Sequence, residues 1–198
     1  LGGVSERKPV IAENVGGLLA GMGDLADEIV VIGAHLDHLG NGEFGSRVGP
    51  GEIHPGADDN ASGSAAIIML ADALAEEYAQ LPEDADARSI LFMGFSAEES
   101  GLNGSRHYAD NPIIDIEDHA LMINFDMIGR IENDRLSVSG MNTGKGMREW
   151  IEGISERTDL ELVMPQRMGG ASDHTSFYRK GIPVLFGIIA DFHGDYHT

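Results

Sequence analysis

The 198-residue sequence contains no cysteine. Disulfides and thiolate metal sites are therefore excluded, and any bound metal must be held by oxygen and imidazole ligands. No apolar run reaches the roughly 20 residues that a membrane-spanning helix needs. The sequence begins with Leu1 instead of Met and shows no signal-peptide pattern. We therefore expect a processed or excised piece of a longer protein.

Basic residues are also scarce. The 13 Lys and Arg residues face 33 Asp and Glu residues, which gives a formal net charge of -20. This charge repels a phosphate backbone and argues against nucleic acid as a partner. Hydrophobic residues make up 42% of the sequence, enough for one sizeable core. We expect a single domain, residues 1–198, that lacks flanking segments at both ends.

Short β-rich runs alternate with stretches of helical period, a pattern typical of an α/β fold. It predicts a central, mostly parallel (mixed) sheet with helices on both faces. Strands are expected at 13–19, 28–34, 89–95, 120–125, 135–139 and 183–189, and helices at 61–79, 146–157 and 172–180. In the second helix Met147, Trp150, Ile151 and Ile154 should share one buried face. The glycine-rich stretch 40–56 predicts a long, flexible loop.

Side chains of the kind that bind metals lie at or after four of the predicted strands. They occur in the segments AHLDH, FSAEES, NFDMIG and DYHT, and a fifth segment, GADDNASG, precedes the first long helix. The carboxyl ends of strands form the ligand-binding crevice of an open α/β sheet, so these groups are expected to converge. Each motif alone has an ordinary explanation, such as a polar pair, a helix start or a turn cap. Their occurrence together favours a metal site.

These five motifs, spread from Asn14 to Thr198, resemble those of the co-catalytic zinc aminopeptidases and their relatives, the glutamate carboxypeptidases and glutaminyl cyclases. The resemblance implies the zinc-exopeptidase fold and two zinc ions, for which cobalt or manganese could substitute. It implies that Asp59 bridges both ions and is followed by a cis peptide. The complete ligand set that it implies is His35, Asp59, Glu99, Asp126 and His197, with His35 and Asp126 on one ion and Glu99 and His197 on the other.

The resemblance further implies an aminopeptidase, which hydrolyses the N-terminal peptide bond of a peptide with a water that bridges the two ions. Glu98 would be the general base that takes the proton of this water and delivers it to the leaving amine. Adjacent residues leaving a strand point in different directions, so Glu98 can be the base while Glu99 binds metal. Asp37 would support catalysis by orienting the imidazole of His35.

Residues for substrate binding are indicated by two further segments. ASDHTSF resembles the family segment that lines the substrate pocket, so Asp173 and His174 are candidates for substrate contact or for support of the site. Met127 and Ile128 directly follow a metal ligand and are candidates for the side-chain pocket. The remaining histidines are expected to be surface or hydrogen-bonded residues: His38, His54, His107, His119 and His193.

Other functions on the same scaffold stay open. A carboxypeptidase or dipeptidase would need a cation for the terminal carboxylate, and only Arg130 and Arg167 lie near the motifs. Glutaminyl cyclase is disfavoured because the motifs suit two metals. A non-catalytic, receptor-like domain should have lost ligands or the base, and all six positions carry competent residues here.

Two further expectations concern the setting of the domain. Analogy with the family suggests a secreted or periplasmic protein. Terminal residues fray unless they are tied down, so we expect weaker metal binding at the ion that depends on His197.

Overall fold

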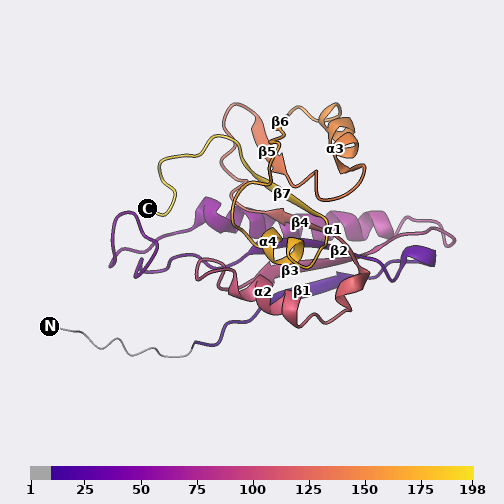
Figure 1. The fold of residues 1–198 in the computed structure, drawn as a ribbon, viewed down its shortest axis with the longest axis horizontal. Coiled ribbons are helices and arrows are strands. Elements are labelled where there is room, and N and C mark those ends of the chain that lie inside the picture. Colours follow the sequence, from indigo (N-terminus) through magenta and orange to yellow (C-terminus); the bar gives the residue numbers. More distant parts are fainter. Residues whose placement is uncertain (1–9) are drawn as a thin grey trace.

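The computed structural model in Figure 1 describes residues 10–198, which form a seven-stranded mixed sheet. The strands are β1 (Val15–Leu19), β2 (Ile29–His35), β3 (Ser89–Phe95), β4 (His119–Phe125), β5 (Arg135–Ser139), β6 (Glu161–Val163) and β7 (Val184–Ile189). Their order is β1-β3-β2-β4-β7-β5-β6. The four central strands β3, β2, β4 and β7 are parallel, and β1 runs antiparallel to β3. Strand β5 runs antiparallel to β7 and parallel to β6. The predicted α/β fold is confirmed.

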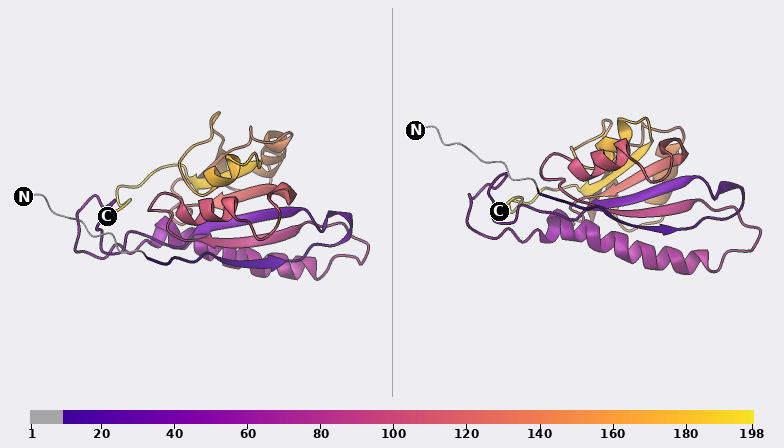
Figure 2. Two further views of the ribbon diagram at one scale, coloured as in Figure 1. Left: turned by 60° about the horizontal axis from the view of Figure 1, so that its bottom comes forward. Right: turned by 90° about the horizontal axis from the view of Figure 1, so that it is seen from below.

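Helices cover both faces of this sheet. They are α1 (Gly63–Tyr78), α2 (Asn103–Asp110), α3 (Met147–Ser155) and α4 (His174–Tyr178). Figure 2 shows α1 along one face, with α2 and α4 on the opposite face. Short helical turns lie at Gly23–Leu25, Ala57–Ser62 and Ile116–Asp118. No helix in the described part of the chain is long and apolar enough to cross a membrane.

The central strands are almost entirely apolar because both of their faces are buried. Ile32 and Phe92 pack against α1, where Ile67 is the buried contact. On the other face Tyr108 of α2 and Phe177 of α4 join the core. Phe177 is fully buried, so its replacement by Ala should cost about 4 kcal/mol of stability.

Two elements were not predicted, and one predicted contact is wrong. Helix α2 has few apolar residues in its sequence NGSRHYAD, and β6 has only three residues, so neither carries a periodic signal. Trp150 was expected on the buried face of its helix, but 47% of it is exposed. Met147 and Ile151 bury that face of α3 instead.

The parallel strands end at the same edge of the sheet, and this edge carries the predicted metal-binding segments. His35 is the last residue of β2 and pairs in register with Phe95, the last residue of β3. Glu98 follows β3, Asp126 follows β4, and the segment that contains His197 follows β7. The topology therefore brings these segments to one end of the molecule.

Candidate metal centre

His35 lies at the centre of the first of two groups of potential metal ligands. Its side chain is 1% exposed, and its Nδ1 lies 3.1 Å from the carbonyl oxygen of Asp37. If Nδ1–H donates to this oxygen, Nε2 keeps its lone pair. Nε2 faces Oδ1 of Asp59 and Oδ1 of Asp126, each at 3.3 Å. We call His35, Asp59 and Asp126 the first ligand group, since their atoms are close enough to hold one metal ion.

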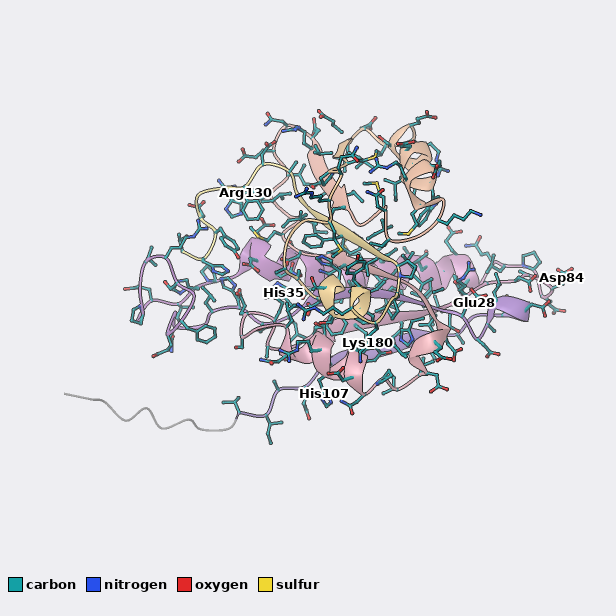
Figure 3. The ribbon with its side chains drawn as sticks, in the orientation of Figure 1. Glu28, His35, Asp84, His107, Arg130 and Lys180 are labelled. Atoms are coloured by element: carbon teal, nitrogen blue, oxygen red, sulfur yellow. The ribbon has the colours of Figure 1, made fainter. Side chains whose placement is uncertain are left out.

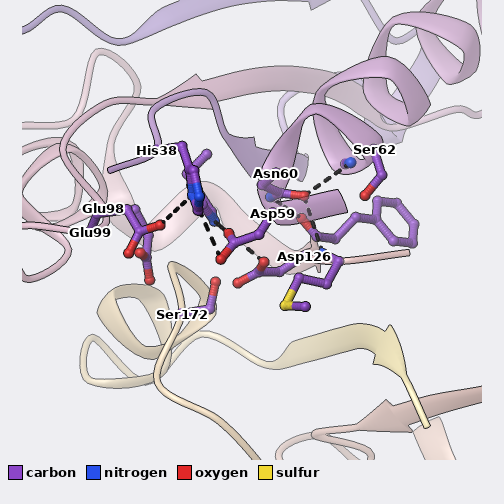
Figure 4. A network of polar contacts seen from close by, with 12 residues as sticks. His38, Asp59, Asn60, Ser62, Glu98, Glu99, Asp126 and Ser172 are labelled. Carbon is purple, nitrogen blue, oxygen red and sulfur yellow. Dashed lines mark hydrogen bonds and ion pairs between the residues drawn. The ribbon is translucent and has the colours of Figure 1, made fainter. Parts of the chain in front are cut away.

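The side chain of Asn60 fixes the turn that carries Asp59. Its Nδ2 donates to the carbonyl oxygen of Phe125 at 3.0 Å, and its Oδ1 accepts from the main-chain N–H groups of Gly63 at 3.0 Å and Met127 at 3.2 Å (Figure 4). These bonds tie the turn before α1 to the end of β4. The expected cis peptide between Asp59 and Asn60 is present.

Asp59 also belongs to a second group on its other side. His38, Asp59 and Glu99 offer atoms close enough to hold another metal ion. Nε2 of His197 lies 3.2 Å from Oδ2 of Asp59 and 3.3 Å from Oε2 of Glu99. We call His38, Asp59, Glu99 and His197 the second ligand group. All five predicted ligands therefore lie together around Asp59.

His38 is a member of this group that the sequence did not single out. Its Nδ1 lies 2.8 Å from Oε1 of Glu99, and Figure 4 shows the ring directed at this carboxylate. From the sequence we expect His38 to be a surface or hydrogen-bonded histidine. Its position three residues after His35, in the segment HLDH, was the available signal.

Asp37 contacts the site in a different way from the one predicted. Its carboxylate lies 3.8 Å from Nδ1 of His35, whereas its main-chain oxygen lies at 3.1 Å and is the contact that orients the ring. The carboxylate instead accepts hydrogen bonds from the main-chain N–H groups of Glu98 and Glu99, at 3.0 and 3.3 Å. Asp37 thus joins the end of β2 to the turn that carries both glutamates.

The carboxylates create a strongly negative site. Burial lowers the pKa of His35, but hydrogen bonds with Asp126 and Asp59 outweigh burial and raise it to about 12. Burial raises the pKa of Glu98 to about 8 and that of Glu99 to about 7, and neighbouring carboxylates add to both shifts. The site therefore favours a positive charge next to Nε2 of His35.

Asp173 and His174 are fully buried behind these groups. Among the described residues, neither carboxylate oxygen of Asp173 and neither ring nitrogen of His174 has a hydrogen-bond partner. Burial raises the pKa of Asp173 to about 7, with the charge of Asp126 adding to the shift. The sequence left open direct substrate contact or support of the site, and their burial favours support.

A cavity of about 110 Å³ lies over both ligand groups. Of the two candidates for the side-chain pocket, Met127 lines this cavity and Ile128 is not among its lining residues. Its other walls include the side chains of Phe186, Ile188, Phe192 and Tyr196, which were not predicted. Apolar and aromatic residues are common in core strands, so these residue types gave no sign of a pocket in the sequence. Only their positions in the fold show that they line the cavity.

A wider cavity of about 410 Å³ adjoins the first, because Asp59 and Tyr196 line both. Arg130 also lines the wider cavity and is ion-paired with Asp195. In Figure 3, His35 and Arg130 lie toward the same end of the molecule, whereas Glu28 and Asp84 lie at the opposite end. The two cavities together form the candidate site.

The donor set fits divalent cations. Imidazole nitrogens and carboxylate oxygens suit zinc, and the same ligands accept cobalt or manganese. Nε2 of His197 has no hydrogen-bond partner within residues 10–198, although it is buried between two carboxylates. A cation bound between this nitrogen and the two carboxylates would satisfy it.

Comparison with known proteins gives consistent results. The profile of peptidase family M28 matches residues 14–198. Aminopeptidase YwaD of Bacillus subtilis is 31% identical over 160 residues, which cover 78% of this chain and 30% of that protein. Leucine aminopeptidase 1 of Pyrenophora teres f. teres is 31% identical over 175 residues, which cover 84% of this chain and 43% of that protein. This chain thus spans less than half the length of these relatives.

Solved structures show the same similarity. The zinc aminopeptidase BSAP from Bacillus subtilis superposes with a TM-score of 0.71 at 27% identity, covering 93% of this chain and 43% of that one. The aminopeptidase from Aneurinibacillus sp. strain AM-1 gives a TM-score of 0.71 at 28% identity, covering 93% and 41%. On the match of the family profile to nearly all of its length, the chain belongs to peptidase family M28.

Proposed function

We propose that this chain is a metal-dependent aminopeptidase that hydrolyses the first peptide bond of a peptide. The observation that carries the proposal is the meeting of two ligand groups at Asp59, with Glu98 on the same cavity. His35 and Asp126 would hold one ion, Glu99 and His197 would hold the other, and Asp59 would bind both. Two divalent ions, zinc by similarity to the relatives, would acidify a shared water and polarise the substrate carbonyl.

Glu98 is the proton carrier in this mechanism. It lines the cavity over the two ligand groups but belongs to neither, so its carboxyl group is not used to bind a metal ion. It takes the proton of the attacking water and delivers it to the amino group that leaves. The hydrogen bond from its main-chain N–H to Asp37 holds it at the cavity wall.

The charges of the site favour a free amino terminus over a free carboxylate. Glu98, Glu99 and Asp126 line the smaller cavity and suit an ammonium group. Among the described residues that line either cavity, Arg130 is the only lysine or arginine, and Asp195 already neutralises it. A carboxypeptidase on the same scaffold is the second candidate, and Arg130 is the residue that would serve it.

The contrast between Glu98→Gln and Glu99→Gln tests the two assigned roles. Glu98→Gln should lower kcat for amino-acid p-nitroanilides about 10²–10⁴-fold, because the proton carrier is lost. It should still bind two ions, whereas Glu99→Gln should lose tight binding of one. Glu76→Gln, on the exposed face of α1, is the matched control. Full activity in Glu98→Gln, or in protein stripped of metal by a chelator, would contradict the mechanism.

Substrate polarity can be tested separately. A dipeptide with a free amino group should be cleaved, and the same dipeptide with an acetylated amino group should not. Efficient cleavage of the acetylated peptide, lost on Arg130→Ala, would favour the carboxypeptidase.

A further inference from the structure

The loop from residue 40 to 56 contacts the segment that carries His197. Figures 1 and 2 show the C-terminal segment, in yellow, beside this purple loop in each view. The main-chain N–H of Arg47 donates to the carbonyl oxygen of His197 at 2.9 Å. The guanidinium carbon of Arg47 lies 4.8 Å from the ring centroid of Tyr196, within the range of a cation–π contact. These contacts join the loop to His197, a member of the second ligand group, and to its neighbour Tyr196.

A third contact orients the imidazole of His197. Its Nδ1 lies 3.1 Å from the carbonyl oxygen of Gly45, so Nδ1–H donates to the loop. Nε2 then carries the lone pair and faces Asp59 and Glu99. A hydrogen bond from the second ring nitrogen sets both the tautomer and the direction of a metal-binding histidine. The loop therefore selects the form of His197 that can bind metal.

The backbone of His197 depends on such contacts. Its φ is 59°, in the left-handed region that residues with a Cβ rarely adopt. A conformation of this kind persists where the surroundings hold it. The ring also stacks on Tyr196, with centroids 3.8 Å apart, and Tyr196 is the residue under Arg47.

Hydrogen bonds within the loop keep its shape. The hydroxyl of Ser46 accepts from the main-chain N–H groups of Val48 at 3.1 Å and Gly49 at 2.9 Å. It also lies 2.8 Å from Nε2 of His54, whose Nδ1 lies 3.0 Å from the carbonyl oxygen of Glu52. With Nδ1–H donated to Glu52, Nε2 of the buried His54 is an acceptor, and it shares the single hydroxyl proton of Ser46 with the carbonyl oxygen of Gly49, which lies 3.1 Å from the hydroxyl. The hydrogen bonds of Ser46 thus hold together both sides of the loop, directly next to Gly45.

We propose that the loop 40–56 is a positioning element for the second metal ion, with Ser46 and Arg47 acting through His197. The proposal rests on the two-ion site of the proposed function. His35 is oriented by the carbonyl of Asp37, outside this loop. The loop should therefore control the affinity of one ion without changing that of the other.

Competitive zinc titration of the whole chain against a chromophoric chelator tests this inference. Ser46→Ala should weaken binding of the second ion about tenfold. This is the lower end of the loss of affinity expected when a residue that supports a metal ligand is removed. Arg47→Ala should weaken it a few-fold, and Arg47→Lys should recover part of the loss because it keeps the cation. Val48→Ala, an exposed change in the same loop, is the matched control and should leave both affinities unchanged. The cobalt spectrum of the second ion should change in Ser46→Ala and in Arg47→Ala, and it should stay unchanged in Val48→Ala.

The outcomes separate this inference from the proposed function. Selective weakening of one ion, with unchanged melting of the metal-free protein, supports the positioning role. Equal weakening of both ions, or no weakening in Ser46→Ala and Arg47→Ala, overturns it while the two-ion enzyme stands. A wild-type chain that binds a single ion overturns both.

Discussion

The carboxylate of Asp37 accepts a hydrogen bond from the main-chain N–H of Glu98, with 3.0 Å between Oδ1 and the nitrogen. Its other oxygen accepts from the N–H of Glu99 at 3.3 Å. The side chain of Asp37, which follows β2, therefore holds the turn after β3. This turn carries the proposed base, Glu98, next to the proposed metal ligand, Glu99. The relative position of the base and the metals depends on this link.

Replacing Asp37 by Asn tests the link. An amide has one oxygen, so one of the two N–H groups loses its acceptor and meets another donor. We expect kcat to fall about 10–100-fold with a smaller change in KM, because the base is displaced. Asp110→Asn, in an exposed ion pair with Lys180, should leave both constants unchanged. Normal kcat in Asp37→Asn would show that the turn keeps its geometry without this bond.

His38 should contribute to the second ion through Glu99. Its Nδ1 lies 2.8 Å from Oε1 of Glu99, which leaves Oε2 directed at His197. We expect His38→Ala to weaken binding of the second ion about 10–100-fold, measured by zinc titration. His38→Gln keeps a donor and should recover part of the affinity, and His107→Ala on the exposed side of α2 is the control. Equal zinc affinities of the second site in wild type and His38→Ala would show that His38 does not contribute to binding of the second ion.

The sequence predicted the parts of the site that depend on strand ends. His35 and Asp126 lie where buried apolar strands stop, a position that local pattern identifies well. His38 was underestimated because its importance comes from Glu99, 61 residues away. The hydrogen bonds that join His197 to the carbonyl oxygen of Gly45 and to the main-chain N–H of Arg47 were not predictable, since a glycine-rich loop has no period that reveals its partners. Likewise α2 gave no signal because tertiary contacts of Tyr108, and not its own sequence period, bury it.

Ile188 should help to set the size of the side-chain pocket. It lines the smaller cavity with Phe186 and Met127, so an apolar N-terminal side chain suits these walls. We expect Ile188→Ala to raise kcat/KM for phenylalanine relative to leucine p-nitroanilide about tenfold, because lost methylenes make room for a larger ring. Ile113→Ala, at an exposed position that does not line the cavity, is the control. An unchanged ratio would place the side chain of the substrate elsewhere, for example in the wider cavity.

His174 should make the stability of the fold depend on pH. Burial lowers its pKa from 6.5 to about 4, because the charged ring is disfavoured next to Phe186, on which it stacks. Between these two values the unfolded chain binds a proton that the folded chain does not, so the free energy of unfolding falls as pH falls. The stability that depends on a neutral His174 is therefore fully present above pH 6.5, and it is lost progressively as the pH falls toward 4.

The pH dependence can be measured by urea unfolding of the metal-free protein at about pH 7.5 and about pH 5. Over this interval His174 should account for about 2 kcal/mol of lost stability. His174→Phe keeps a ring that stacks on Phe186 but cannot bind a proton, so this variant should lose about 2 kcal/mol less than wild type over the same interval. Protonation of the carboxylates and of His35 is common to both proteins and cancels in the difference. Equal losses in the two proteins would mean that His174 takes up its proton in the folded state, with a partner or an access to water that its burial in this structure excludes.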